Sequence, residues 1–282
     1  MTVSQWMQSA RRQLEASGCP DPAVDARWMM EDTLNLTPQD LAFEPHRAIP
    51  EAALERLEAM LRRRVEGEPV QYILGSADFM GLRFKVAPGV LLPRQDTETL
   101  AEAALIDLRE RPGRPEVLDL CAGSGCIGLS LASLAPKARL TLSDLSREAL
   151  EVARENAREM GIHARLCQGD LFGAVNGRRF DLIVSNPPYI PRAQLEGLQR
   201  EVRFEPALAL DGGDDGLDFY RRIARTAPEH MNPGASLYLE VGAGQAPDVL
   251  ALVKAHIPCR QAGTIKDLNG VERVVYGMRN EE

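Results

Sequence analysis

The sequence predicts an α/β protein in which a mostly parallel sheet carries helices on both faces, with a small helical domain ahead of it. From residue 117 onward, short apolar runs alternate with helical segments, which is the rhythm of βαβ units. Over residues 1–75 the periodicity is helical. At 282 residues, 44% of them hydrophobic, the chain is long enough for one large domain and a small additional one.

The N-terminal residues 1–75 are expected to form the helical domain. One amphipathic helix is indicated by apolar residues that share a face, namely Leu54, Leu57, Leu61 and Val65. Pro50 suits the first turn of that helix, and Thr37-Pro38 opens a shorter one in the same way. Asp21-Pro22 opens a further helix that we expect to end near Asn35.

A two-stranded connector is expected over residues 76–95. Here Leu82, Phe84 and Val86 alternate with charged residues, and Gly81 stands where a hairpin would turn. The large domain should then span 96–282 and begin with a helix at about 97–109. No helix follows the last strand, so we expect this strand to insert antiparallel at an edge of the sheet. The predicted strands of this domain cover residues 117–120, 140–142, 164–167, 180–185, 236–241 and 273–278.

Composition argues against several classes of function. The formal charge of −8, from 41 acidic and 33 basic residues, argues against a duplex-DNA partner, because phosphate binding favours a basic face. The five cysteines are scattered without a CxxC pair and the four histidines stand far apart, so we expect neither a metal site nor disulfides. The N-terminus has no secretory pattern and no segment has the pattern of a membrane span, which favours the cytoplasm.

A glycine loop, Gly123-Ser-Gly125-Cys-Ile-Gly128, follows the first strand of the large domain and opens a helix. Glycines allow a close approach to a ligand, and the helix N-terminus supplies free N–H donors. Asp144 ends the next strand, where a carboxylate can accept hydrogen bonds from both ribose hydroxyls. Asp119 lies ahead of the loop and could orient its backbone or meet a cationic amine. This pattern predicts a nucleoside ligand but fits both NAD and S-adenosylmethionine.

The tetrapeptide Asn186-Pro-Pro-Tyr189 follows the strand at 180–185 and favours the second of these ligands. Its prolines stiffen the segment and leave carbonyl acceptors without competing donors. Methylation of an amide-like nitrogen is difficult because the lone pair is delocalised. The Asn186 Oδ1 and the Pro187 carbonyl could accept the two N–H bonds and aim the lone pair at a methyl group, so that no strong base is needed.

These motifs together resemble the protein-(glutamine) methyltransferases of the PrmC/HemK family, and the resemblance covers nearly the whole chain. It implies the class I S-adenosylmethionine-dependent methyltransferase fold, a Rossmann-like sheet with an antiparallel edge strand, joined by a β-hairpin to a substrate-docking domain. Besides the glycine loop and Asn186 to Tyr189, the segments that carry it are Gly67 to Gly75, Leu92 to Glu98, Glu205-Pro206, Ala209 to Gly213, Asp215 to Leu217, Glu240 to Gly242, Gln245, and Asp267 to Arg273.

The resemblance implies methyl transfer from S-adenosyl-L-methionine to the glutamine side chain of the Gly-Gly-Gln motif in translation release factors, leaving S-adenosyl-L-homocysteine. We expect release factors as partners, no duplex nucleic acid, no membrane and a monomeric chain. The implied catalytic and glutamine-binding residues are Asn186, Pro187, Pro188 and Tyr189. The cofactor-binding residues we expect are Asp119, Cys121, Ala122, Gly123, Ser124, Gly125, Asp144, Asp170, Leu171 and Asn186.

Two residues depart from the family pattern. Leu171 stands where many members have tryptophan. With leucine there, aromatic stacking on the adenine, worth about 1 kcal/mol of binding, would be lost. Cys121 stands where many have glycine, a mild change if the backbone φ there is negative.

Other enzymes remain as alternatives. A sister family methylates a ribosomal protein, but its proline-arginine segment differs from Pro93 to Glu98. Adenine-N6 DNA methyltransferases usually add a basic recognition region, and we interpret the short run Arg62-Arg-Arg64 as a solvent-exposed helix face. A nicotinamide dehydrogenase would need a hydride-transfer site that we do not recognise, and the intact Asn186 argues against a non-catalytic adaptor.

Overall fold

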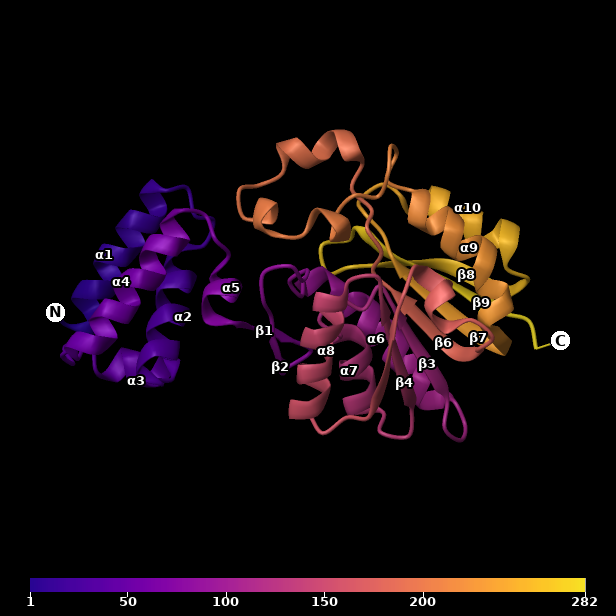
Figure 1. Ribbon diagram of the computed structural model, residues 1–282. Helices are drawn as coiled ribbons and strands as arrows, with labels where there is room; N and C mark the ends of the chain where they lie inside the picture. The colour runs from indigo at the N-terminus through magenta and orange to yellow at the C-terminus, as the bar shows by residue number, and fades with distance from the viewer. Residues whose placement is uncertain (282) are drawn as a thin grey trace. The chain divides into compact units, whose positions relative to one another are not determined.

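The structure is a computed structural model that describes residues 1–281 and divides into two compact units (Figure 1). Unit 1 comprises Met1–Ser76 together with Gln199–Phe204, and unit 2 comprises Ala77–Leu198 with Glu205–Glu282. The chain therefore leaves unit 2 after Leu198, contributes six residues to unit 1, and returns at Glu205.

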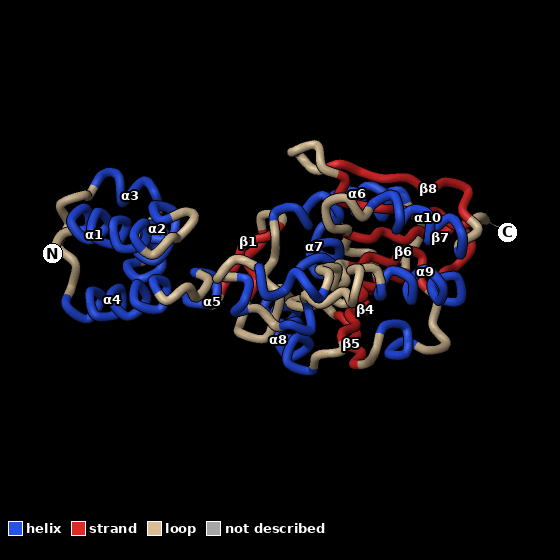
Figure 2. Tube along the Cα trace, turned by 90° about the horizontal axis from the view of Figure 1, so that it is seen from above, coloured by secondary structure: helices blue, strands red, loops and turns tan. Residues whose placement is uncertain are grey.

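Unit 1 is built from helices and loops (Figure 2). A capping box stabilises the N-terminus of the first helix, because the Thr2 hydroxyl accepts from the Gln5 N–H and the Gln5 side chain accepts from the Thr2 N–H. The helix opened by Pro22 ends at Asn35 in the left-handed conformation, as predicted. Trp6, Met29 and Leu57 are fully buried in a shared core. The helices are α1 (Val3–Ala16), α2 (Pro22–Leu34), α3 (Pro38–Phe43), α4 (Glu51–Val65) and α5 (Val70–Leu74).

The interpretation of Arg62 to Arg64 as a solvent-exposed face is wrong for Arg64. Arg62 and Arg63 are exposed, but the Arg64 side chain is only 4% exposed. Its guanidinium donates to Asp25 Oδ2 at 2.5 Å and pairs with Glu201 from the inserted segment Gln199–Phe204. A buried charge is tolerated when it is paired in this way, and neither partner is a sequence neighbour of Arg64.

The predicted hairpin, β1 (Ser76–Phe79) and β2 (Leu82–Lys85), belongs to unit 2 from Ala77 onward, and unit 2 also contains a seven-stranded sheet. The sheet order is β5-β4-β3-β6-β7-β9-β8. The last strand, β9, is antiparallel to β7 as predicted, and its other side pairs with an additional strand, β8, that forms the edge. The strands are β3 (Glu116–Leu120), β4 (Arg139–Asp144), β5 (Ala164–Gln168), β6 (Phe180–Ser185), β7 (Met231–Glu240), β8 (Cys259–Lys266) and β9 (Glu272–Arg279).

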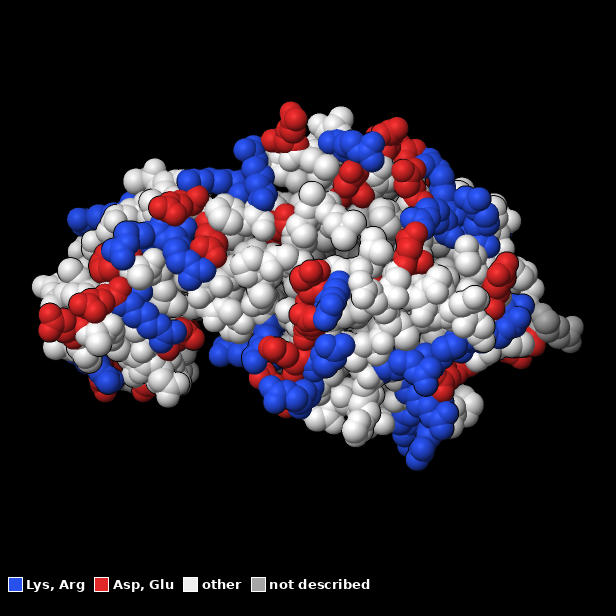
Figure 3. All heavy atoms as spheres, viewed as in Figure 1, with Lys and Arg blue, Asp and Glu red and all other residues white. Residues whose placement is uncertain are grey.

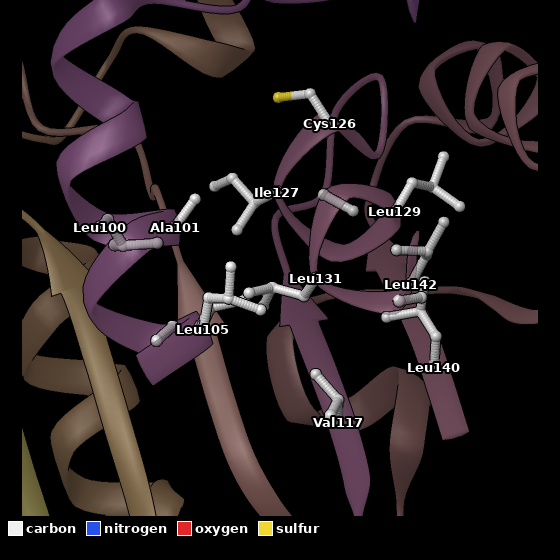
Figure 4. Packing of buried hydrophobic residues seen from close by; sticks show 14 of the residues in the cluster. Leu100, Ala101, Leu105, Val117, Cys126, Ile127, Leu129, Leu131, Leu140 and Leu142 are labelled. Carbon is white, nitrogen blue, oxygen red and sulfur yellow. The ribbon is translucent and has the colours of Figure 1, made fainter. Parts of the chain in front are cut away.

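Helices cover both faces of this sheet. Leu100 and Leu105 of α6 (Gln95–Glu110) pack with Ile127 and Leu131 of α7 (Cys126–Leu134) on one face (Figure 4). This core also takes alanines from α8 (Arg147–Glu159). The other face is covered by α9 (Asp218–His230) and α10 (Ala246–His256). Burial on both faces explains why apolar residues predominate in the central strands β3 and β6.

The strand register brings the predicted site residues to one edge of the sheet. Leu120 at the end of β3 is level with Ser143 of β4 on one side and with Ser185 of β6 on the other. Because these strands are parallel, the glycine loop, Asp144 and Asn186 all follow carboxyl ends at the same edge.

Charged side chains of both signs are interspersed over much of the face shown in Figure 3. Oppositely charged side chains also pair at the surface, as Arg221 of α9 does with Asp215 and Asp218. Within residues 1–281, no helix is both long enough and apolar enough to cross a membrane.

Candidate active site

A cavity opens at the carboxyl ends of β3, β4 and β6. It encloses about 1000 Å³ of empty space, its open mouth included, and most of its lining is apolar. Arg94 is the one cation among the described residues that line it. The predicted site residues in its wall are Cys121, Ala122, Gly123, Ser124, Asp144, Asp170, Leu171, Asn186 and Pro188. Asp119, Gly125, Pro187 and Tyr189 lie outside the lining.

The glycine loop is shaped by backbone conformation. Gly123 (56°) and Gly125 (79°) have positive φ, as does Cys121 (63°) just ahead of the loop, and Gly125 caps the start of α7. A Cβ atom on Gly128 would lie 2.7 Å from Leu142 Cδ2. The third glycine of the motif therefore allows α7 to pack closely against the sheet.

Asp144 holds the loop in place. Its Oδ2 accepts from the Gly123 N–H and its Oδ1 accepts from the Ser146 N–H, each at 2.8 Å. Burial raises the pKa of this carboxyl, and the backbone hydrogen bonds oppose the rise. Each oxygen keeps a further lone pair, so Asp144 can still accept hydrogen bonds from a ligand.

Asp119 is fully buried, and its Oδ2 accepts from the Gly128 N–H at 2.8 Å. Burial raises the pKa of Asp119 to about 7. Of the two roles considered from the sequence, the observed contact is with the backbone at the first turn of α7.

Both departures from the family pattern stand at positive φ. The condition that made cysteine a mild change at position 121 is not met, because φ is +63° there and a side chain in the left-handed region is strained by about 1 kcal/mol. Leu171 has a φ of +47° and is 8% exposed, so it offers the cavity an apolar surface.

The Asn186-Pro-Pro-Tyr189 segment is held by side chains from distant parts of unit 2. Asn186 Nδ2 donates to Thr97 Oγ1 of α6 at 3.4 Å, while Asn186 Oδ1 is buried and has no partner within residues 1–281. The Tyr189 carbonyl accepts from Gln245 Nε2 at 2.9 Å. Burial raises the pKa of Tyr189 to about 12, so its phenol stays protonated at neutral pH.

Several residues of this region were not identified as site residues from the sequence. Thr97 and Glu240 are each 2% exposed and lie beside Asn186, where the Glu240 carboxylate interacts with the Thr97 hydroxyl and the Asn186 amide. Glu205 accepts from the Leu92 N–H at 3.1 Å and pairs with Arg94 in the cavity wall. One of these residues, Glu240, could have been identified from the sequence, because it is a charged residue at the end of an apolar strand.

Comparison with known proteins gives consistent matches along the chain. Residues 5–75 match the PrmC N-terminal domain, and residues 84–201 match the methyltransferase small domain. The release factor glutamine methyltransferase of Geobacter sulfurreducens is 42% identical over 98% of this chain and 96% of its own length. The enzyme of that name from Moorella thermoacetica is 42% identical over 100% of both chains.

Two solved structures share the architecture at low identity. A methyltransferase from Pyrococcus furiosus has a TM-score of 0.53 at 18% identity, covering 72% of this chain and 91% of its own. The 16S rRNA N2 G1207 methyltransferase of T. thermophilus, in complex with AdoMet and guanosine, has a TM-score of 0.53 at 20% identity. The match covers 73% of this chain and 50% of that one. They support the class I methyltransferase fold predicted from the sequence.

Proposed function

We infer the reaction of this protein from its family, because the chain belongs to the release factor glutamine methyltransferases. It transfers a methyl group from S-adenosylmethionine to the side-chain amide nitrogen of a release factor glutamine. The substrate residue we propose is the glutamine of the Gly-Gly-Gln motif. The observation that carries the mechanism is Asn186 Oδ1, a buried acceptor in the cavity wall that has no partner in the described part of the chain.

The cavity residues fit the cofactor. S-adenosylmethionine supplies a methyl group made electrophilic by its sulfonium. Asp144 has lone pairs left for the ribose hydroxyls, and nothing lies within 4 Å of where a Cβ on Gly123 would be, so a ligand can approach the loop backbone there. Leu171 and Leu145 offer an apolar surface for the adenine. Arg94 can face the methionyl carboxylate while it pairs with Glu205.

The substrate amide is held by acceptors. A buried carbonyl oxygen without a donor costs about 1–3 kcal/mol, and an N–H of the substrate glutamine removes that cost at Asn186 Oδ1. The Pro187 carbonyl is the second acceptor. The residue that follows it, Pro188, has no N–H that could compete as a donor. With both N–H bonds held, the lone pair is turned toward the methyl group, and positioning supplies the rate enhancement. Once methylated, the cationic nitrogen loses one proton to water, so a strong base is not required.

Unit 1 is the part we propose to dock the release factor, and the cytoplasm is the proposed site of action. Release factors are proteins whose glutamine must reach the cavity of unit 2. A separate helical unit, outside the sheet that carries the cavity, can recognise surface away from the target residue.

The proposed function is tested by incubating the protein with S-adenosylmethionine and a purified release factor, followed by peptide mass mapping. We expect one methyl group on the glutamine of the Gly-Gly-Gln peptide and none on a release factor in which that residue is alanine. Transfer to adenine in DNA oligonucleotides, with none to the release factor, would overturn the proposal. A calorimetric titration that shows binding of NAD but not of S-adenosylmethionine would also contradict it.

A further inference from the structure

A chain of polar side chains lies behind Asn186. Asn186 Nδ2 donates to Thr97 Oγ1 at 3.4 Å, and the Thr97 hydroxyl in turn interacts with the Glu240 carboxylate. The Glu240 side chain also interacts with the Asn186 amide itself. Thr97 and Glu240 are both 2% exposed, so water does not compete for these contacts.

The direction of this chain is fixed by its last member. A hydroxyl can donate or accept and an amide can turn by 180°, but the Glu240 carboxyl, once ionised above its pKa of about 7, only accepts. Glu240 therefore takes the Thr97 O–H, and Thr97 Oγ1 is left to accept from Asn186 Nδ2. The asparagine amide is then held with its nitrogen toward Thr97 and Glu240. Its oxygen is the atom without a partner.

The orientation matters for the reaction because the two ends of the amide have opposite hydrogen-bonding character. An asparagine turned by 180° would present N–H donors to a substrate nitrogen that itself carries N–H bonds. The substrate would lose an acceptor and meet a repelling donor. Asparagine alone cannot prevent this, since its oxygen and nitrogen ends have nearly the same shape.

We propose that Thr97 and Glu240 are positioning residues that fix the Asn186 amide with its oxygen available to the substrate nitrogen. This inference rests on the proposed function and adds two residues to the site. A fold-stabilising role alone does not account for Glu240, because its Oε2 is buried and lacks a hydrogen-bond partner within residues 1–281. A neutral side chain would pack there at a lower desolvation cost.

The test compares Thr97→Val, Thr97→Ser and Glu240→Gln in methyl transfer to the release factor. Thr97→Val keeps the shape of the side chain and removes the hydroxyl, so we expect kcat to fall about 10-fold or more while KM changes little. Thr97→Ser restores the hydroxyl and should recover most of kcat. Glu240→Gln can turn its own N–H toward Thr97 and reverse the chain, so kcat should fall by a similar factor.

The matched control is Thr141→Val in β4. Thr141 is 1% exposed and its hydroxyl accepts from Arg178, so the same substitution removes one buried hydrogen bond outside the cavity lining. Thr141→Val should lower the melting temperature and leave kcat unchanged. If Thr97→Val lowers kcat no more than Thr141→Val does, the positioning role is wrong. Wild-type protein that transfers no methyl to the release factor contradicts the proposed function instead.

A double-mutant cycle with Asn186→Ala locates the effect. If Thr97 acts through Asn186, Thr97→Val should cost nothing further in the Asn186→Ala protein, measured as single-turnover transfer of a radiolabelled methyl group. Multiplicative losses in the double variant would show that Thr97 acts independently and would overturn the proposal.

Discussion

The two halves of the candidate site are held in shape by different means. The cofactor half, from Cys121 to Gly125, is shaped mainly by backbone angles, while Asp144 accepts from the Gly123 N–H and Asn156 donates to the Ser124 carbonyl. The substrate half, Asn186 to Tyr189, is held by side chains from distant parts of the sequence, among them Thr97 and Gln245. A local conformation can be encoded in a short motif, whereas a long-range scaffold is spread along the chain. Substitutions in each half can therefore separate the two by experiment.

Asn186→Ala should have the largest effect on the substrate half. It removes the acceptor proposed to hold the glutamine N–H, and loss of such a group typically costs about 10²–10³-fold in kcat. Binding of S-adenosylmethionine, measured by calorimetry, should weaken only a few-fold. Asn232→Ala, which removes a 2.7 Å hydrogen bond to Asp181 outside the cavity lining, is the matched control and should retain activity. Equal activity of the two variants would contradict the acceptor role.

Two glycine substitutions should break the halves separately. A Cβ on Gly216, where φ is +77°, would lie 2.4 Å from the Tyr189 carbonyl oxygen and 2.6 Å from Gln245 Nε2. Gly216→Ala should therefore reduce methyl transfer about 10-fold or more with little change in cofactor affinity. Gly128→Ala, whose Cβ would lie 2.9 Å from Asp119 Cβ, should instead weaken cofactor binding and cost about 1–3 kcal/mol of stability. The reverse pattern in calorimetry and kinetics would show that the halves are not independent.

Beside each half lies a buried carboxyl that should make stability depend on pH. Burial raises the pKa of Glu240 to about 7 from 4.5, with Arg273 favouring the ionised form and Asp96 opposing it. The folded state thus holds this proton more tightly than the unfolded state, and the stabilisation present below pH 4.5 is lost as pH rises through 7. The free energy of unfolding of wild type minus that of Glu240→Gln should fall by about 1–3 kcal/mol between pH 5 and pH 8.

Asp119→Asn serves as the matched variant in the cofactor half, because burial raises the pKa of Asp119 to about 7 as well. The free energy of unfolding of wild type minus that of Asp119→Asn, measured by urea unfolding, should also fall as the pH rises. Parallel pH profiles for wild type and both variants would mean that the two carboxyls titrate normally in the folded protein.

Cys121→Gly should have the smallest effect. Glycine removes the strain of a side chain at φ +63°, but it also loses the packing of the thiol and increases the entropy of the unfolded chain. We expect a net stabilisation of about 0.5–1 kcal/mol in chemical unfolding. Cys167→Gly makes the same change in strand β5, where φ is not positive, and should destabilise the protein. A loss of stability in both variants would contradict strain at Cys121.

The same contrast explains how far the sequence could be interpreted. Strand-helix alternation and the glycine motif predicted the parallel sheet, and these signals are local. Arg64 was misplaced because its partners, Asp25 and Glu201, lie 39 and 137 residues away in the chain. Thr97 was not identified for a similar reason, because it looks ordinary in its own segment and gains meaning only beside Asn186. Glu240, by contrast, stands out as a charged residue at the end of an apolar strand. The backbone angle at Cys121 also escaped prediction, since cysteine seldom occupies the left-handed region.

The six residues Gln199–Phe204 that complete unit 1 have a consequence for the order in which the protein is made. A ribosome releases residues 1–76 first, but the Glu201 partner of Arg64 emerges about 130 residues later, roughly ten seconds at ordinary rates of synthesis. During that interval the N-terminal helices lack one of the acids that pair with their buried guanidinium. The N-terminal unit is therefore finished only after most of the catalytic unit has been synthesised. It cannot be exchanged between relatives as a single continuous cassette, because its last piece is encoded inside the gene segment for the other unit.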